Sequence, residues 1–316
     1  MGGVTVDISD MHVTTTHAML WLHLERSSGI GYGAIRKTRS VHSKLCELYG
    51  SHSVLNKKGG EFKRFTKAFR MRVGTGTVPT PALGVGTWWD LLRLHGDRYT
   101  KMISSGRRRE ARDALCSLVH AELSFLGFLR PAEQTCMRRE DVWCMLCPPE
   151  RAAKKGVQPF VVLPLMGPTK SSTNEAAGVV VCWVSKSGVR VGDHVKALLT
   201  MYREDGTTKG ALLTHGHDAR AWTPTHALHR VLRPALAELR ARGEGDVSET
   251  SLGRYTLNTF RRGGNSHARD RGAERWQCTA HGRWEGQWEK RDALAMTDLY
   301  DAAGTDRRLV VTSVMG

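Results

Sequence analysis

Near its end the chain reads Asn258-Thr-Phe-Arg261-Arg262-Gly263-Gly264, then His281-Gly-Arg-Trp284, and last Tyr300. The pattern around the first two stretches predicts helices over residues 256–271 and 273–281. Neighbouring residues on a helix point about 100° apart, so only one of Arg261 and Arg262 can face a common site. This part of the chain therefore offers an ordered set of polar side chains carried mainly on helices.

Upstream of that set, the sequence predicts a long helix that ends in a bend. Apolar residues recur at helical spacing over 108–128. Arg130 directly precedes Pro131, and proline disfavours helix at the residue before it but suits the first turn of a new helix. Arg130 is therefore expected at a bend between two helices.

The middle of the chain changes from helical to β-branched patterns. Phe160–Leu163 and Gly178–Val184 are β-branched runs separated by a polar stretch that contains Lys170. They predict a small antiparallel sheet in a mostly helical protein, an α+β fold. Further helices are expected over 88–95 with Thr87 as N-cap, over 193–202, and over 223–242 with a kink at Pro234.

A stretch rich in glycine and proline at 74–81 reads as a linker. We therefore predict a basic helical domain over residues 1–76 and a second domain over 77–316. Helices are expected over 17–24, 40–48 and 60–71 of the first domain.

The charge balance indicates a polyanionic partner. The chain has 316 residues, a net charge of +16 and a pI near 9.9, which favours nucleic acid over a membrane surface. Residues 1–75 carry 12 Lys and Arg against 5 Asp and Glu. Cations suited to phosphate-backbone contact are Arg36, Lys37, Lys57, Lys58, Lys63, Arg64 and Lys67. A solvated face of a helical domain is the alternative interpretation of these residues.

Neither a membrane segment nor a metal site is expected. No apolar run approaches the length of a membrane span, and the first residues lack a signal-peptide pattern. The seven cysteines at irregular spacing read as reduced intracellular thiols, and the single Cys144-Met-Leu-Cys147 has no second pair for zinc. His215, His217, His226 and His229 lack a partnered carboxylate or cysteine at ligand spacing, so we interpret them as exposed histidines.

Two further motifs upstream join these residues in a recognisable order. The full order is Phe125-Leu-Gly-Phe-Leu-Arg130-Pro-Ala-Glu133 with Arg138-Arg-Glu-Asp141, then Gly167-Pro-Thr-Lys170, then Thr259-Phe-Arg-Arg-Gly-Gly264 with Ala280-His-Gly-Arg-Trp284. Over the last two-thirds of the chain this order resembles the tyrosine recombinases, also called phage-integrase-type recombinases. It is most similar to the variety found in some bacterial integrases and crypton-like elements. The resemblance implies an N-terminal core-binding domain and a C-terminal catalytic domain.

The resemblance also implies the roles of individual residues. Arg130 and Arg261 would stabilise charge on a phosphodiester, and planar guanidinium groups suit that task. His281 would exchange a proton, although a histidine that caps a helix before Gly282 is the structural alternative. Lys170 would protonate the leaving 5′ oxygen, with Lys186 as the second choice.

Two positions depart from the family pattern. Asn258 stands where the family has a histidine; an amide can bond a phosphate oxygen but carries no proton at neutral pH. Tyr300 is the only one of six tyrosines that follows His281, at a spacing of nineteen residues that is longer than usual in the family. Tyr300 would be the nucleophile, and a packed C-terminal tyrosine is its alternative. Trp284 would pack beneath the site, and ordinary core packing is its alternative.

Together these residues predict a site-specific DNA recombinase or integrase that forms a 3′-phosphotyrosyl intermediate without metal or ATP. The alternative is a DNA-binding protein that descends from such an enzyme and has lost its activity. The expected partner is double-stranded DNA, with self-association into a tetramer on it, in the nucleus of a eukaryote or the cytoplasm of a bacterium. The tail over 308–314 is apolar and β-prone, and we expect it to dock on a neighbouring protomer.

Overall fold

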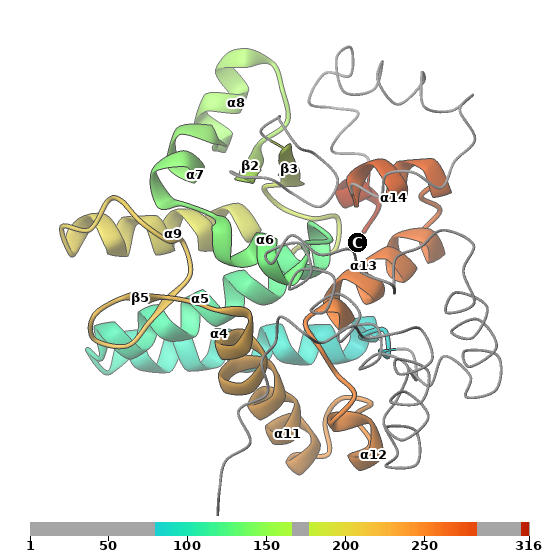
Figure 1. The fold of residues 1–316 in the computed structure, drawn as a ribbon. Coiled ribbons are helices and arrows are strands. Elements are labelled where there is room, and N and C mark those ends of the chain that lie inside the picture. Colours follow the sequence, from blue (N-terminus) through green and yellow to red (C-terminus); the bar gives the residue numbers. More distant parts are fainter. Residues whose placement is uncertain (1–79, 166–176, 283–310, 316) are drawn as a thin grey trace, which may run out of the picture. The chain divides into compact units, whose positions relative to one another are not determined.

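The computed structural model describes residues 80–165, 177–282 and 311–315. The chain separates into two compact units, residues 1–79 and 80–316, and all described residues lie in the second. The helices and the seven cations predicted within residues 1–76 therefore lie outside the described residues. Figure 1 shows the second unit as mainly helices with one small sheet beside them, which agrees with the predicted mainly helical α+β class.

The described elements follow one another in this order: α4 (Val85–Ser104), α5 (Arg108–Leu126), α6 (Pro131–Cys136), α7 (Arg139–Met145), β1 (Leu146–Cys147), α8 (Pro149–Lys155), β2 (Phe160–Leu165), β3 (Ala177–Cys182), α9 (Val191–Glu204), β4 (Thr214–His215), β5 (Arg220–Ala221), α10 (Pro224–His226), η3 (Ala227–Leu232), α11 (Arg233–Ala241), α12 (Glu249–Leu252), α13 (Asn258–Asp270) and α14 (Arg275–His281).

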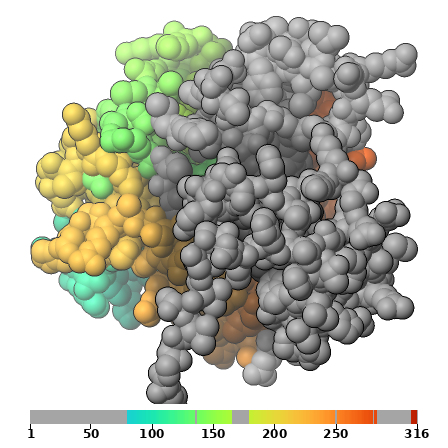
Figure 2. All heavy atoms as spheres, in the orientation of Figure 1, coloured from blue at the N-terminus to red at the C-terminus, as the bar shows by residue number. Residues whose placement is uncertain are grey.

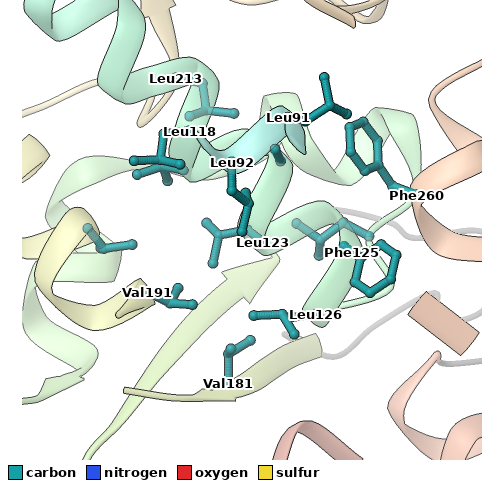
Figure 3. Close-up of a cluster of buried hydrophobic side chains, with 14 of the residues drawn as sticks. Leu91, Leu92, Leu118, Leu123, Phe125, Leu126, Val181, Val191, Leu213 and Phe260 are labelled. Carbon is teal, nitrogen blue, oxygen red and sulfur yellow. The ribbon is translucent and has the colours of Figure 1, made fainter. Parts of the chain in front are cut away.

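Helix α5 forms the centre of the fold. Every residue from Leu118 to Leu126 is buried, which is more than two turns, so no side of this part of the helix faces water. Helices α4, α9 and α13 all contact it. Figure 3 shows side chains from these helices and from the sheet meeting around Leu123 and Phe125. The C-terminal end of α5 is therefore held in place from several directions.

The predicted antiparallel sheet is confirmed, and it has one more strand than expected. Strand β2 pairs with β3 in a register that places Val161 opposite Val181, and the two-residue β1 pairs with the other edge of β2. Val161 and Val181 belong to the main core, whereas Val162 and Val180 pack in a separate cluster on the opposite face. This alternation is the period-2 pattern of a strand.

Two expectations about helix boundaries are wrong. Helix α4 begins at Val85 with Gly84 as its N-cap. Thr87 lies inside the helix, where its hydroxyl accepts a hydrogen bond from the Asp246 amide at 3.1 Å. That tertiary contact explains why a residue with good capping chemistry is not the cap. The helix runs to Ser104, well past the predicted end at His95.

The helical stretch after Thr223 begins as predicted and changes its winding before Pro234. The Thr223 hydroxyl caps the first turn by accepting from the His226 amide at 3.1 Å, with Pro224 in the first turn. Residues Ala227–Leu232 then form a π-helical stretch that leads into α11. Proline lacks an amide hydrogen and crowds the carbonyl four residues earlier, and a wider π turn accommodates both effects.

The predicted β character of the tail is wrong for residues 311–314, which are helical. Val311 in this helix and Met315 just after it are both buried in the core of their own chain. The Thr312 hydroxyl accepts from the Cys182 amide on β3 at 3.2 Å. The tail segment therefore packs on the sheet of its own chain.

Candidate active site

The candidate site forms around the turn that joins α5 to α6, residues 126–130. Phe128 is fully buried and has φ of 47°, a left-handed conformation that is rare for a residue with a bulky side chain. Such backbone strain persists only where surrounding contacts hold it, and it is concentrated at functional sites. The turn therefore needs partners from elsewhere in the fold.

Arg130 lies at the predicted bend, with extended backbone angles and Pro131 at the first turn of α6. Glu133 fixes it in two ways: its carboxylate accepts from the Arg130 amide at 2.7 Å and from Arg130 Nη1 at 3.0 Å. Glu133 is almost fully buried, whereas the Arg130 side chain keeps 22% of its exposure. Arg130 is therefore held in one orientation and still reaches the surface.

Arg261 reaches the same turn from α13. It is buried, and it donates from Nη1 to the Phe128 carbonyl at 2.9 Å and from Nη2 to the Gly282 carbonyl. Arg262 is exposed, so the expectation that only one of the two arginines turns inward is confirmed, and it is Arg261. The Arg261 guanidinium thereby ties the left-handed residue of the turn to the end of α14.

Two glycines bring α13 close enough for that contact. A Cβ added to Gly263 would lie 2.2 Å from the Leu83 carbonyl oxygen, and one added to Gly264 would lie 2.0 Å from the Phe125 carbonyl oxygen. Both distances are far below any real contact, and both neighbours are backbone atoms. The Arg-Arg-Gly-Gly sequence thus combines an inward cation with the close helix approach that positions it.

His281 is the third side chain at the turn. Its Nε2 donates to the Leu126 carbonyl at 2.7 Å, and its ring meets Phe128 edge-on with the centroids 4.7 Å apart. A carbonyl oxygen only accepts, so this bond places a proton on Nε2. His281 is half-buried at the end of α14.

The structure thus brings Arg130, Arg261 and His281 to one turn. The bonds from Arg261 and His281 span 133 and 155 residues of sequence. Asn258 begins α13 and is exposed, and Lys186 is exposed in the loop before α9. Lys170, Trp284 and Tyr300 lie outside the described residues.

The sequence analysis included Glu133 in the motif around Arg130 but assigned it no role. It did not single out Phe128. Glu133 had a readable signal, because a glutamate three residues after a helix cap is the second half of a capping box. Nothing in the local sequence marks Phe128, and its carbonyl is bonded by Arg261 from a distant helix.

The histidines outside this site form no metal cluster in the described part of the chain. His215 stacks on His226 with their ring centroids 3.8 Å apart, which is a ring contact and not a ligand geometry. No group of three or more His, Cys, Asp or Glu suitable for a metal occurs among the described residues. Within the same ranges, no helix is long and apolar enough to cross a membrane.

Comparison of the sequence with models of protein families and with curated proteins finds no match.

Proposed function

We propose that the protein is a DNA strand transferase of the tyrosine recombinase type. Tyr300 attacks a phosphodiester of double-stranded DNA, a bond forms between the phenolic oxygen and phosphorus, and the 5′ oxygen leaves as a hydroxyl. A 5′ hydroxyl from another strand then displaces the tyrosine and reseals the backbone. The covalent intermediate conserves the energy of the broken bond, so the reaction needs no nucleotide cofactor.

One observation carries the proposal: Arg130, Arg261 and His281 converge on the turn over 126–130, in the order and with the chemistry of the resemblance. Arg130 offers a fixed and partly exposed guanidinium for the non-bridging oxygens, on which negative charge grows during attack. Arg261 holds the turn and adds a second positive charge beside it. His281 offers an imidazole for proton exchange with the phenol or with a phosphate oxygen.

Lys170 completes the proposal as the general acid that protonates the leaving 5′ oxygen. Assembly into a tetramer on DNA is part of the same proposal, because exchange between two duplexes breaks four strands. The basic residues of positions 1–75 would supply contacts to the DNA backbone.

A DNA-binding protein without catalytic activity is the second candidate, and Asn258 favours it. Asn258 is exposed at the start of α13, one turn before Arg261, where the family carries a proton-exchanging histidine. The two candidates differ in a single measurable property, the covalent bond to Tyr300.

The test is a trapping experiment. Purified full-length protein is incubated with a library of nicked duplexes of random sequence. Cleavage close to the nick releases a short strand that diffuses away, so the covalent intermediate cannot be resealed. Denaturing electrophoresis and peptide mass spectrometry should then find DNA attached to Tyr300. The adduct should vanish in Tyr300→Phe and persist in Tyr99→Phe, which changes a half-buried tyrosine on α4.

Two further variants sharpen the result. Arg130→Ala should slow adduct formation by about 100-fold or more, the usual effect of removing one donor to a developing oxyanion. Glu133→Gln should slow it less, because the guanidinium stays but loses its carboxylate partner. DNA binding in a gel-shift assay with no adduct in any arm would support the inactive candidate. An adduct that persists in Tyr300→Phe would refute the assignment of the nucleophile.

A further inference from the structure

A cavity of about 270 Å³ opens between α7, α9 and the loop over 207–210, away from the turn that carries Arg130. Helices α7 and α9 lie side by side in Figure 1, and the green and yellow segments that include them form part of the face in Figure 2. The side chains that matter for its chemistry are Arg139, Trp143, Cys144, Tyr202, Arg203 and Lys209.

Arg139 is a buried cation at this cavity. Only 5% of the residue is exposed, and its guanidinium lies over the Tyr202 ring at 3.8 Å from the centroid. Its Nε donates to the Ala211 carbonyl at 2.7 Å and its Nη1 to the Thr207 carbonyl at 2.6 Å. Within the described part of the chain, neither a hydrogen bond from Nη2 nor an ion pair of Arg139 is found. A guanidinium held this rigidly is prepared to donate to an anion.

The walls of the cavity add positive charge and an aromatic surface. The Arg203 guanidinium lies over the Trp143 ring at 4.1 Å, and Trp143 is 37% exposed. Among the described residues, neither Arg203 nor Lys209 takes part in an ion pair. The one carboxylate of the lining, Glu140, already accepts from the Gly210 amide at 2.9 Å and from Arg138 Nε at 2.8 Å. Three cations against one carboxylate give the lining a net charge of +2.

We propose that this cavity binds a small anion with a flat ring, of the chemical class of a nucleoside monophosphate. Arg139, Arg203 and Lys209 would receive the anionic group, and the ring would lie against the exposed part of Trp143. The cavity of about 270 Å³ lies at the lower end of the size range of ligand pockets, about 300–1,000 Å³, so it would hold one small molecule at most. The inference does not depend on the proposed strand transfer, since no residue of the cavity belongs to that site.

Isothermal titration of the full-length protein with adenosine 5′-monophosphate, ribose 5-phosphate and inorganic phosphate tests the proposal. The nucleotide should bind saturably and at least tenfold more tightly than inorganic phosphate, with ribose phosphate near the latter. Arg203→Gln and Lys209→Gln should each weaken nucleotide binding by about tenfold, the usual effect of losing one bond to a charged group. Equal affinity for all three ligands would overturn the proposal, because the ring would not be recognised.

Two controls separate this cavity from the rest of a basic surface. Arg190→Gln removes an exposed arginine in the loop before α9 and should leave nucleotide binding unchanged. Arg130→Gln removes a cation of the candidate active site and should do the same. If Arg130→Gln abolishes binding while Arg203→Gln does not, the nucleotide sits at the DNA site and the cavity proposal falls.

Cys144 gives a readout that does not depend on affinity measurements. It is exposed and lines the cavity, whereas Cys116, Cys147, Cys182 and Cys278 are buried. Bound nucleotide should slow alkylation of Cys144 by iodoacetamide several-fold in the wild type but not in Arg203→Gln, as measured by peptide mass spectrometry. An unchanged alkylation rate at saturating nucleotide would also overturn the proposal.

Discussion

Replacing Gly264 by alanine should break the close approach on which the candidate site depends. The new methyl group would meet the Phe125 carbonyl oxygen at 2.0 Å. A carbon–oxygen contact needs roughly 3.2 Å, so α13 would have to move away by about 1 Å. Overpacking of this kind costs about 1–3 kcal/mol, and a clash with backbone belongs at the upper end. Alanine regains roughly 1 kcal/mol of helix propensity, so we expect a net loss of about 2 kcal/mol.

Gly96→Ala provides the matched control. Gly96 lies inside α4, and a Cβ added there meets nothing within 4 Å. The same chemical change should therefore stabilise the protein by roughly 0.5–1 kcal/mol through helix propensity alone. The two variants should thus shift stability in opposite directions.

Urea unfolding followed by circular dichroism measures both variants, with the free energy of unfolding extrapolated to water. The trapping experiment on the same samples tests the functional consequence. Arg261 bonds to Phe128 from α13, so a shift of this helix should slow adduct formation in Gly264→Ala even where the protein remains folded. Equal stability of Gly264→Ala and Gly96→Ala would refute the packing argument.

The remaining predictions concern pH and the tail. Burial lowers the pKa of His95 to about 3 and that of His120 to about 4. Both side chains are therefore neutral in the folded protein, whereas in the unfolded chain they take up protons as the pH falls below about 6.5. The free energy of unfolding should therefore fall as the pH is lowered from 7.5 to 5, by about 4 kcal/mol in total for the two histidines. Burial raises the pKa of Glu122, which opposes part of this loss. Urea unfolding at several pH values measures the effect in the wild type and in the His95→Gln, His120→Gln double variant. An equal pH dependence of the wild type and the double variant would contradict the assignment. Thr312→Val should lower the free energy of unfolding by about 1–2 kcal/mol, because the Cys182 amide loses its acceptor. Thr312→Ser keeps the hydroxyl and should lower it less. Equal stability of the two variants would show that this hydrogen bond contributes nothing.

Local rules in the sequence were sufficient for the bend and for the strands. The dipeptide Arg130-Pro131 favours extended backbone at the arginine and a helix start at the proline through local sterics alone. The β-branched residues of 160–163 and 178–182 alternate between two apolar environments, and the second strand ends two residues before the predicted run does. Both predictions follow from sterics and burial over a few residues, and the structure bears them out.

Long-range contacts decided the features that the sequence did not predict. Thr87 has good capping chemistry, yet its hydroxyl serves the Asp246 amide, so α4 starts earlier. Phe128 adopts a left-handed conformation, and its own carbonyl accepts a hydrogen bond from Arg261, which lies 133 residues away in the sequence. No window of local sequence contains both members of either pair.

Arg261 connects the parts of the candidate site, and this affects how its variants are interpreted. One guanidinium joins the Phe128 carbonyl to the Gly282 carbonyl, next to the residue that carries the imidazole of His281. Its removal would therefore release the turn that presents Arg130 and the end of α14 together, in addition to removing a positive charge. A loss of activity in Arg261→Ala is expected from positioning alone, because the three groups act as one unit and their effects are not additive. Arg130 is held by the Glu133 carboxylate, so its substitution leaves the bonds from Arg261 and His281 to the turn in place and tests the contribution of charge more directly than Arg261→Ala does.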